Sequence, residues 1–281
     1  MSAIIMDGKA LAEKLREALK SEINKLDRKP GLGVIIVGNN PASKIYVKRK
    51  QEACSKAGIF SVKVELPETA TEEQVEAEIE KFNNDENIDG ILVQLPLPGH
   101  LNEEKMLGLV SKDKDVDGFH LVNLGKLVSG EKRIEACTPK GVMKLLDHYK
   151  ISLEGKHAVV VGRSRIVGKP VSLLLLEKNA TVTMCHSKTI NLKEYTTKAD
   201  ILIMAVGKPH LIKKEMVKHN AVVIDVGMNR MGEGVVGDVD FEGVSQVASY
   251  ITPVPGGVGP MTIAMLLENC MELYKIHEGN K

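Results

Sequence analysis

The chain has no tryptophan and few other aromatic residues, so it lacks the stacking platforms typical of proteins that bind single-stranded nucleic acid. Its formal net charge is +1, which favours neither nucleic acid nor an acidic membrane surface as a partner. No apolar run approaches the length that spans a bilayer, and the N-terminus lacks the basic start and apolar core of a signal peptide. We therefore expect no nucleic-acid partner and no membrane attachment.

Cysteine is also scarce, and the four cysteines are scattered widely along the chain, at Cys54, Cys137, Cys185 and Cys270. Because no C-x-x-C pair or Cys/His cluster is present, we expect no metal site. Free thiols of this kind fit a reducing compartment, which predicts a cytoplasmic protein. The remaining composition, 43% hydrophobic and 27% charged, is that of a globular protein, and 281 residues suit two domains.

Helix and strand patterns alternate nearly throughout the chain. A first series has strand patterns at 32–37, 61–66 and 88–95, with helices between them and an opening helix at about 7–26. A second series, after a loop at 113–118 and a helix at about 139–149, has strand patterns at 157–161, 181–185, 200–205 and 221–226. Such alternation predicts an α/β protein with parallel sheets.

We expect two α/β lobes around a cleft. The first would be a catalytic domain at 1–120, joined by the last helix and C-terminus at 261–281. The second, at 121–260, would be a Rossmann-like, doubly wound parallel sheet. The last helix carries a continuous apolar stripe that another element must cover, so we expect it to return to the first lobe.

The most informative segment runs from Val160 to Pro170. An apolar strand ends at Gly162, a second glycine follows at Gly168, and an apolar helix pattern begins there. Strand, glycine turn and helix start form the corner that grips phosphates in dinucleotide-binding folds, although an ordinary strand-to-helix turn has the same outline. Arg163 and Ser164 fill the positions after the first glycine, which places a guanidinium beside the phosphates.

The second strand of this series, 181–185, is followed by His186 and Ser187 and not by a carboxylate. An acidic residue there would hold the ribose hydroxyls of NAD and would repel a 2′-phosphate. Ser187 and Arg163 would instead donate hydrogen bonds to such a phosphate, so we expect NADP as the cofactor. Met228 follows the strand at 221–226 and is either a cofactor neighbour or a side chain that fills a gap in the core.

A second group of polar residues lies in the first series. Tyr46 and Lys50 are four residues apart on one helix and share a face, so Lys50 is either a partly desolvated amine suited to proton exchange or a surface side chain lying over the tyrosine. Gln94 ends an apolar strand, where its amide can point toward a ligand. Asp117 lies in an acidic loop that lacks the glutamate of a calcium site, and it suits an amino-bearing ring or simply a solvated turn.

The segment from Pro255 to Pro260 holds three glycines between two prolines. Glycines allow close backbone approach to a ligand, and prolines stiffen the loop, so a ligand-lining role is favoured over a plain tight turn.

Taken together, these motifs resemble the bifunctional methylenetetrahydrofolate dehydrogenase/cyclohydrolase family of one-carbon metabolism. The resemblance spans nearly the whole chain and is carried by these stretches in order: 46–50, 93–98, 114–119, 162–170, 185–189 and 251–262. It implies two reactions in one cleft: oxidation of 5,10-methylenetetrahydrofolate to the methenyl cation with NADP, and hydrolysis of that cation to 10-formyltetrahydrofolate. It also implies a homodimer.

The resemblance assigns roles to individual residues. It makes Lys50 the central catalytic group assisted by Gln94, and it gives Asp117 a place among the catalytic residues, bonding the amino-pyrimidine edge of the pterin. The folate site would comprise Tyr46, Lys50, Val93, Gln94, Leu95, Asp117, Pro255, Gly256, Gly257, Val258 and Gly259. The cofactor site would comprise Gly162, Arg163, Ser164, Ser187 and Met228, where the family commonly has isoleucine in place of Met228.

Three alternatives stay open from the residues alone. The chain could be a dehydrogenase without the second activity, an NAD-preferring relative, or a non-catalytic nucleotide sensor on the same fold. The sequence also leaves open whether Lys50 acts as a neutral base or as a cation that polarises the attack through Gln94 and water.

Overall fold

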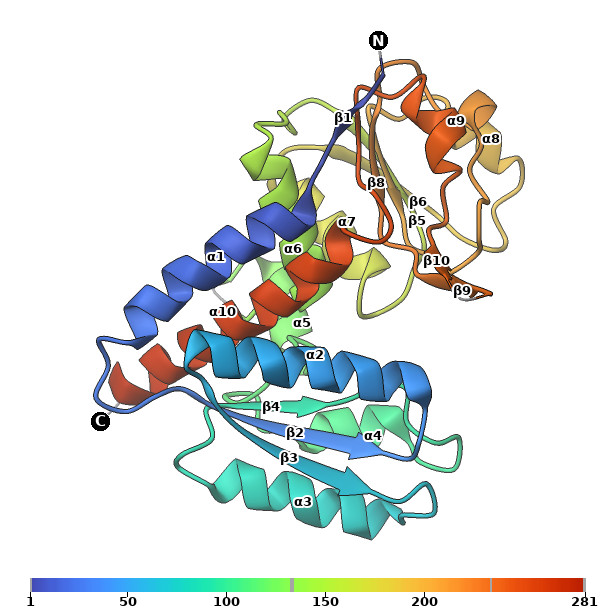
Figure 1. Cartoon of the computed structure of the whole chain (residues 1–281). Helices are drawn as coiled ribbons and strands as arrows, with labels where there is room; N and C mark the ends of the chain where they lie inside the picture. Colours follow the sequence, from blue (N-terminus) through green and yellow to red (C-terminus); the bar gives the residue numbers. More distant parts are fainter. Residues whose placement is uncertain (1, 132–133, 233, 280–281) are drawn as a thin grey trace. The chain divides into compact units, whose positions relative to one another are not determined.

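A computed structural model describes residues 2–131, 134–232 and 234–279, and the chain divides into two compact units (Figure 1). The six-stranded unit comprises Met1–Glu13 and Ala136–Thr262, and the three-stranded unit comprises Lys14–Glu135 and Ile263–Lys281. The division falls within the first and last helices, α1 (Gly8–Ile23) and α10 (Val258–Gly279). In the parts of the chain given above, no helix has the length and apolar character needed to cross a bilayer.

The three-stranded unit contains a parallel sheet in the order β3-β2-β4. Every residue of the central strand β2 is buried, because helices cover both faces of a parallel sheet. The elements of this unit, besides parts of α1 and α10, are β2 (Gly31–Val37), α2 (Pro41–Ala57), β3 (Phe60–Leu66), α3 (Glu72–Asn84), β4 (Gly90–Val93), α4 (Glu103–Leu109) and α5 (Leu121–Ser129).

Local signals in the sequence fix the helix starts of this unit. The side chain of Asn40 accepts hydrogen bonds from the backbone N–H groups of Ala42 and Ser43, and Pro41 occupies the first turn of α2, where no N–H is needed. The same helix ends at Gly58, whose φ of 84° suits glycine. Thr71 and Gln74 form a reciprocal capping box at the start of α3.

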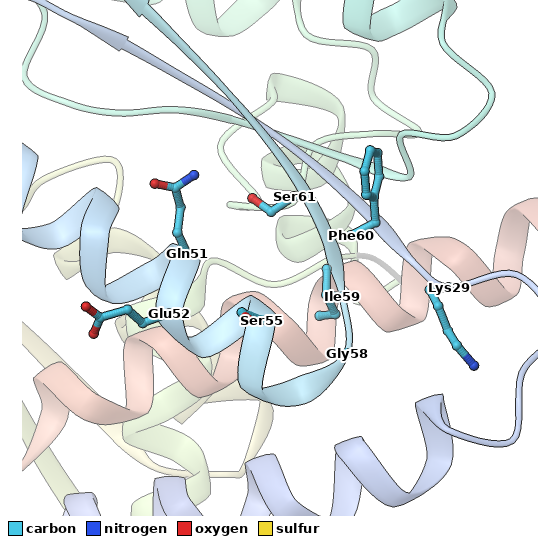
Figure 2. Close-up of a pocket in the computed structure, with 8 residues that line it drawn as sticks. All are labelled: Lys29, Gln51, Glu52, Ser55, Gly58, Ile59, Phe60 and Ser61. Carbon is cyan, nitrogen blue, oxygen red and sulfur yellow. The ribbon is translucent and has the colours of Figure 1, made fainter.

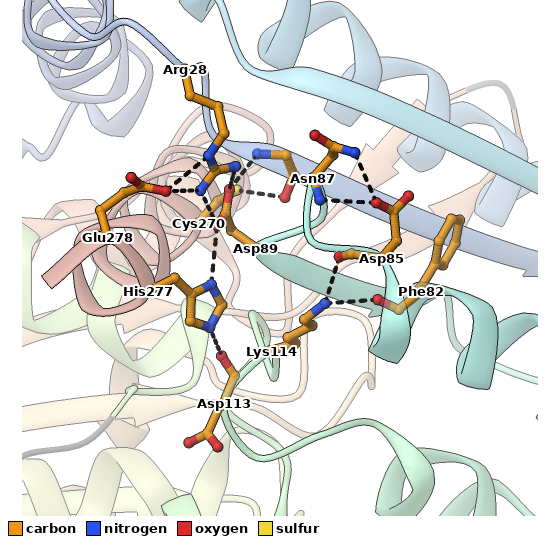
Figure 3. Close-up of polar contacts among 11 residues, drawn as sticks. Arg28, Phe82, Asp85, Asn87, Asp89, Asp113, Lys114, Cys270, His277 and Glu278 are labelled. Carbon is orange, nitrogen blue, oxygen red and sulfur yellow. Dashed lines mark hydrogen bonds and ion pairs between the residues drawn. The ribbon is translucent and has the colours of Figure 1, made fainter. Parts of the chain in front are cut away.

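Helix α10 is attached to this sheet by a buried ionic cluster (Figure 3). Asp89, whose side chain is fully buried, accepts two hydrogen bonds from Arg28 at 2.8 and 2.9 Å and one from the backbone N–H of Gly31. His277 Nδ1, from the last turn of α10, lies 3.0 Å from the same carboxylate. The expected return of the last helix to the first sheet is therefore observed within this unit.

The six-stranded unit holds a second, wholly parallel sheet in the order β1-β11-β8-β7-β5-β6. Its main elements are β1 (Ile4–Ile5), α6 (Cys137–His148), β5 (His157–Val161), α7 (Gly168–Glu177), β6 (Thr181–Cys185), α8 (Leu192–Thr196), β7 (Ile201–Met204), a 3₁₀ turn (Lys214–Met216), β8 (Val222–Asp225), α9 (Phe241–Ser245) and β11 (Tyr250–Ile251). A short antiparallel hairpin, β9 (Asn229–Met231) and β10 (Gly234–Val236), projects from it.

The strand order of this sheet reverses beside β5. The chain first adds β6 on one side of β5 and then β7 on the other, so the carboxyl ends of β5 and β7 flank the point where α/β sheets bind their ligands. Figure 1 shows α7 on one face and α8 and α9 on the other, which is the doubly wound arrangement. The predicted fold class is thus confirmed.

Several details differ from the sequence predictions. Strands β1 and β11 are only two residues long, which is too short for a periodic pattern to reveal. Strand β1 nevertheless places the start of the chain in the six-stranded unit and not with the first sheet. Helix α10 starts at Val258 and not at Met261, because Gly259 and Pro260 both fit a first helical turn. Strand β4 is shorter than the apolar run 88–95 suggests.

Candidate active-site residues

The structure brings Lys50 and Gln94 together in the three-stranded unit. Lys50 lies on α2 and is only 8% exposed, and its Nζ donates a 3.0 Å hydrogen bond to Gln94 Oε1. Gln94 directly follows β4, and its own Nε2 donates to the carbonyl oxygen of Leu95 at 2.7 Å. The amide is therefore oriented by two contacts, and the alternative of a surface lysine is excluded by its burial.

Tyr46 lies one turn before Lys50 on α2 and is half-buried. Burial raises the pKa of its phenol, an effect that nearby Arg49 partly offsets, so the hydroxyl stays protonated at neutral pH. Cys54 lies one turn after Lys50 and is fully buried, and burial raises the pKa of its thiol to about 12. Cys54 is thus an unreactive packing residue, whereas Tyr46 and Lys50 are the polar groups of this helix face.

The three carboxylates of the acidic loop, Asp113, Asp115 and Asp117, have different surroundings. Asp113 is exposed and pairs with Lys112, whereas Asp115 is buried and accepts hydrogen bonds from the backbone of Phe119 and His120. Asp117 is half-buried in the same loop. Among the described residues, no group of three acidic, histidine or cysteine side chains could hold a metal ion. The loop is therefore built around Asp115, and a ligand-binding role for Asp117 stays a prediction.

The glycine corner of the six-stranded unit has the form expected for a phosphate site. Gly162, with φ of 133°, packs against the carbonyl of Ala205, and a Cβ at either Gly162 or Gly168 would overlap backbone atoms. Ser164 Oγ accepts from the backbone N–H groups of Val167 and Gly168 at 3.1 and 3.3 Å. These contacts hold the turn so that helix α7 begins beside the end of β5, where its dipole favours an anion.

Arg163 and Ser187 follow the ends of two neighbouring strands. Val161 of β5 and Cys185 of β6 are paired in register, and the N–H of Gly162 donates to the Cys185 carbonyl at 2.9 Å. Both Arg163 and Ser187 are exposed at this edge. An exposed guanidinium and hydroxyl, with no carboxylate ending β6, fit the 2′-phosphate of NADP.

The loop 255–259 and Met228 lie in the same unit. Lys9 donates its backbone N–H to the carbonyl of Gly256, and Gly8 packs directly on Gly257, so part of the glycine content serves the close approach of α1. Met228 is 44% exposed, which excludes the gap-filling alternative, and its Cε approaches Gly259. A folate-lining role for residues 255–259 stays a prediction.

Comparison with known proteins decides the family. The catalytic-domain model of tetrahydrofolate dehydrogenase/cyclohydrolase matches residues 6–117, and the model of its NAD(P)-binding domain matches residues 136–278. The chain belongs to the tetrahydrofolate dehydrogenase/cyclohydrolase family. The resemblance inferred from the motifs is therefore confirmed over almost the entire chain.

Individual members of the family are similar in sequence and in structure. The Bifunctional protein FolD of Halalkalibacterium halodurans is 55% identical over 98% of this chain and 100% of its own. The bifunctional FolD structure from Campylobacter jejuni has a TM-score of 0.96 at 49% identity and covers 98% of this chain and 99% of its own. The Trypanosoma brucei enzyme, solved with NADP cofactor and an inhibitor, has a TM-score of 0.95 at 38% identity, with 98% of each chain covered.

The described residues also line two cavities, one in each unit. A cavity of about 640 Å³ lies where α2 ends and β3 begins, and it is lined by residues of that region together with Lys29 (Figure 2). Gln94 follows the opposite, carboxyl end of the sheet, so this cavity is separate from the Lys50–Gln94 pair. A second cavity, of about 450 Å³, lies at the amino ends of the six-stranded sheet, around Lys156 and Lys218.

Sequence reasoning missed two carboxylates of the six-stranded unit, Asp225 and Asp238, which are 3% and 0% exposed. One signal was present: Asp225 ends a wholly apolar strand, where a charged side chain needs a specific set of partners.

Proposed function

We propose that the chain oxidises 5,10-methylenetetrahydrofolate to the 5,10-methenyl cation with NADP and hydrolyses this cation to 10-formyltetrahydrofolate. The observation that carries the proposal is the buried Lys50 amino group bonded to Gln94. A non-catalytic nucleotide sensor of the same fold would have no use for that pair. The match of both family models over their respective parts of the chain supports the same activity.

The six-stranded unit contributes the cofactor site. NADP, when bound, accepts the hydride that leaves the methylene carbon of the folate. Gly162 packs on the Ala205 carbonyl and Gly168 packs on the Gly162 carbonyl, and Ser164 holds this tight turn, which would receive the pyrophosphate. Arg163 and Ser187 would bind the 2′-phosphate, while Met228, after β8, presents an exposed apolar surface at the carboxyl edge of the same sheet.

The three-stranded unit contributes the proton chemistry. In the hydrolytic step, water adds to the methenyl carbon, the bond from that carbon to N5 breaks, and a formyl carbonyl forms on N10. One of the two water protons ends on N5, and the other is released. Lys50 accepts the released proton from the attacking water, and its hydrogen bond to Gln94 holds the amino group in place for this transfer. Asp117 binds the amino-pyrimidine edge of the pterin, and Tyr46 packs on its ring, with Val93 and Leu95 on either side of Gln94.

The decisive experiment is an absorbance assay for the methenyl product with purified protein, methylenetetrahydrofolate and either NADP or NAD. Product formed with NADP, followed by its decay to the formyl compound, is the expected result. Product that never decays would favour a monofunctional dehydrogenase, and faster turnover with NAD would favour the NAD-preferring alternative. Nucleotide binding without any product would favour the alternative of a non-catalytic nucleotide sensor.

We further propose a cytoplasmic homodimer. The described cysteines are free and buried, which suits a reducing compartment. Strand β6 is a sheet edge that exposes Met184, and such an edge is a ready surface for a second copy. Light scattering at micromolar concentration should give twice the mass of the 30.7 kDa chain, and a monomeric mass would contradict this proposal.

A further inference from the structure

Two buried carboxylates lie beneath the carboxyl edge of the six-stranded sheet. Asp225 is the last residue of β8, and Asp238 follows the β9–β10 hairpin. The backbone N–H of Asp238 donates to Asp225 Oδ1 at 3.0 Å, so the two residues are directly linked. Neither has an ion-pair partner among the contacts of the described residues; both are held by backbone and amide donors.

Asp238 binds the segment that follows β7. Its Oδ2 accepts from the N–H groups of Val206 and Gly207 at 2.8 and 3.0 Å, and its Oδ1 accepts from Lys208 at 2.8 Å. The side-chain amide of Asn229 donates to the same Oδ1 at 2.9 Å. One carboxylate therefore fixes three consecutive N–H groups after β7 and joins them to the start of β9.

Asp225 binds the backbone that follows β8 in the same way, by accepting hydrogen bonds from N–H groups. It accepts from Gly227 at 2.8 Å, from Asp238 at 3.0 Å and from Val239 at 2.8 Å. Its own N–H donates to Thr252 Oγ1 at 2.8 Å, in the segment that leads to the 255–259 loop. Met228 lies between Gly227 and Asn229, which bond to Asp225 and Asp238 respectively.

Two glycines allow the carboxylates to lie directly against the backbone. A Cβ at Gly227 would overlap the carboxylate of Asp238, and a Cβ at Gly237 would overlap that of Asp225. The segment after β7 also packs on the glycine corner, because Ala205 carries the carbonyl that contacts Gly162. Asp238 is thus linked to the glycine turn through Val206 and Ala205, and Asp225 is linked to it through Asp238.

We propose that Asp238 and Asp225 are positioning residues for NADP: they hold segments 206–208 and 227–229 in the form that receives the cofactor. The inference rests on the proposed placement of NADP at this edge of the sheet. Only an ionised carboxylate can accept all these donors at once. An asparagine keeps one acceptor oxygen and turns an NH₂ group toward the remaining N–H groups.

The test compares Asp238→Asn with Asp200→Asn. Asp200 is a matched control, since it also accepts a backbone N–H in the same sheet, from His157, but at the opposite, amino edge. NADP affinity is measured directly by calorimetry, and hydrolysis of added methenyltetrahydrofolate is measured without NADP. We expect Asp238→Asn to weaken NADP binding by about tenfold or more, with hydrolysis within about twofold of wild type.

Asp200→Asn should leave NADP affinity within about twofold of the wild-type value even if its melting temperature falls. Should Asp238→Asn fail to fold, Asn229→Ala removes one donor from the network and should weaken NADP binding by a smaller factor. Unchanged NADP affinity in folded Asp238→Asn, or equal weakening in Asp200→Asn, overturns this inference alone. A wild type that binds no NADP overturns the proposed cofactor placement and this inference with it.

Discussion

The amino group of Lys50 is 3.0 Å from the side-chain oxygen of Gln94; Lys50 is buried and Gln94 is half-buried. The amide nitrogen of Gln94 is in turn bonded to Leu95, so the amide cannot rotate away without losing two hydrogen bonds. The neutral amide thus holds the Lys50 amino group in place without adding a charge of its own beside it. This relationship motivates the first two predictions.

Replacing Lys50 by methionine should abolish hydrolysis of the methenyl cation while the protein stays folded. Methionine fills a similar volume but cannot exchange a proton, and positioned proton transfer is worth about 10²–10⁴-fold in rate. Stopped-flow absorbance with added methenyltetrahydrofolate measures the effect. The exposed neighbour Lys48→Met is the matched control and should hydrolyse at the wild-type rate. Normal hydrolysis by Lys50→Met would refute the assigned role.

Replacing Gln94 by leucine should lower both stability and hydrolysis, because the buried Lys50 amino group loses its hydrogen-bond acceptor. A buried polar group without its partner costs about 1–3 kcal/mol of unfolding free energy. In the double variant Lys50→Met/Gln94→Leu most of that loss should be recovered, since no buried polar group is left without its partner. Urea unfolding of the four proteins gives the coupling energy, and strictly additive losses would show that the pair does not act as a unit.

Replacing Arg163 by alanine should raise the KM for NADP by about 10- to 100-fold, because charge-assisted hydrogen bonds are worth about 1.5–3 kcal/mol. The KM for NAD, which has no 2′-phosphate, should change little and so serves as the internal control. Initial rates with both cofactors measure the ratio. An equal rise for NADP and NAD would mean that Arg163 acts on some other part of the nucleotide.

Replacing Asp89 by asparagine should destabilise the three-stranded unit by about 3–5 kcal/mol, because a carboxylate that pairs with Arg28 is removed from a buried position. His277 loses the same partner, which loosens the end of α10. Asp113→Asn, at an exposed carboxylate, should change stability by less than about 0.5 kcal/mol. Urea unfolding of both variants distinguishes the buried cluster from a general effect of lost charge.

Asp225 should give an unusual pH dependence of stability. Burial raises its pKa from an ordinary value of 3.8 to about 6, outweighing the backbone donors that act in the opposite direction. Between these two pH values the folded protein binds more protons than the unfolded chain. The contribution of this group to the free energy of unfolding therefore rises as pH falls through 6 and levels off below 3.8.

The measurement is the difference in unfolding free energy between wild type and Asp225→Asn at several pH values. Between pH 7 and pH 4, the unfolding free energy of wild type should rise relative to that of the variant by up to roughly 3 kcal/mol. Each pH unit between the folded and unfolded pKa values contributes about 1.36 kcal/mol. A difference that stays constant over this range, or that falls with decreasing pH, contradicts the assignment.

Part of the candidate site could be predicted from local sequence and part could not. Gly162, Arg163 and Ser164 follow an apolar strand directly, so strand, turn and helix signals within a dozen residues were enough to identify the corner. Lys50 and Tyr46 were paired by helical spacing alone. The bond from Lys50 to Gln94, by contrast, joins residues 44 positions apart and depends on how α2 packs beside β4.

By itself the sequence determined the α/β class, the main helices and the glycine corner, because each of these arises from periodicity, capping and turn residues that are close together in the chain. Only the tertiary structure decided that the N-terminal strand joins the six-stranded sheet, and that Asp89, Asp225 and Asp238 are buried. Those outcomes depend on partners contributed by distant segments. The energy of a buried carboxylate is set by the donors that surround it, and no local pattern specifies them.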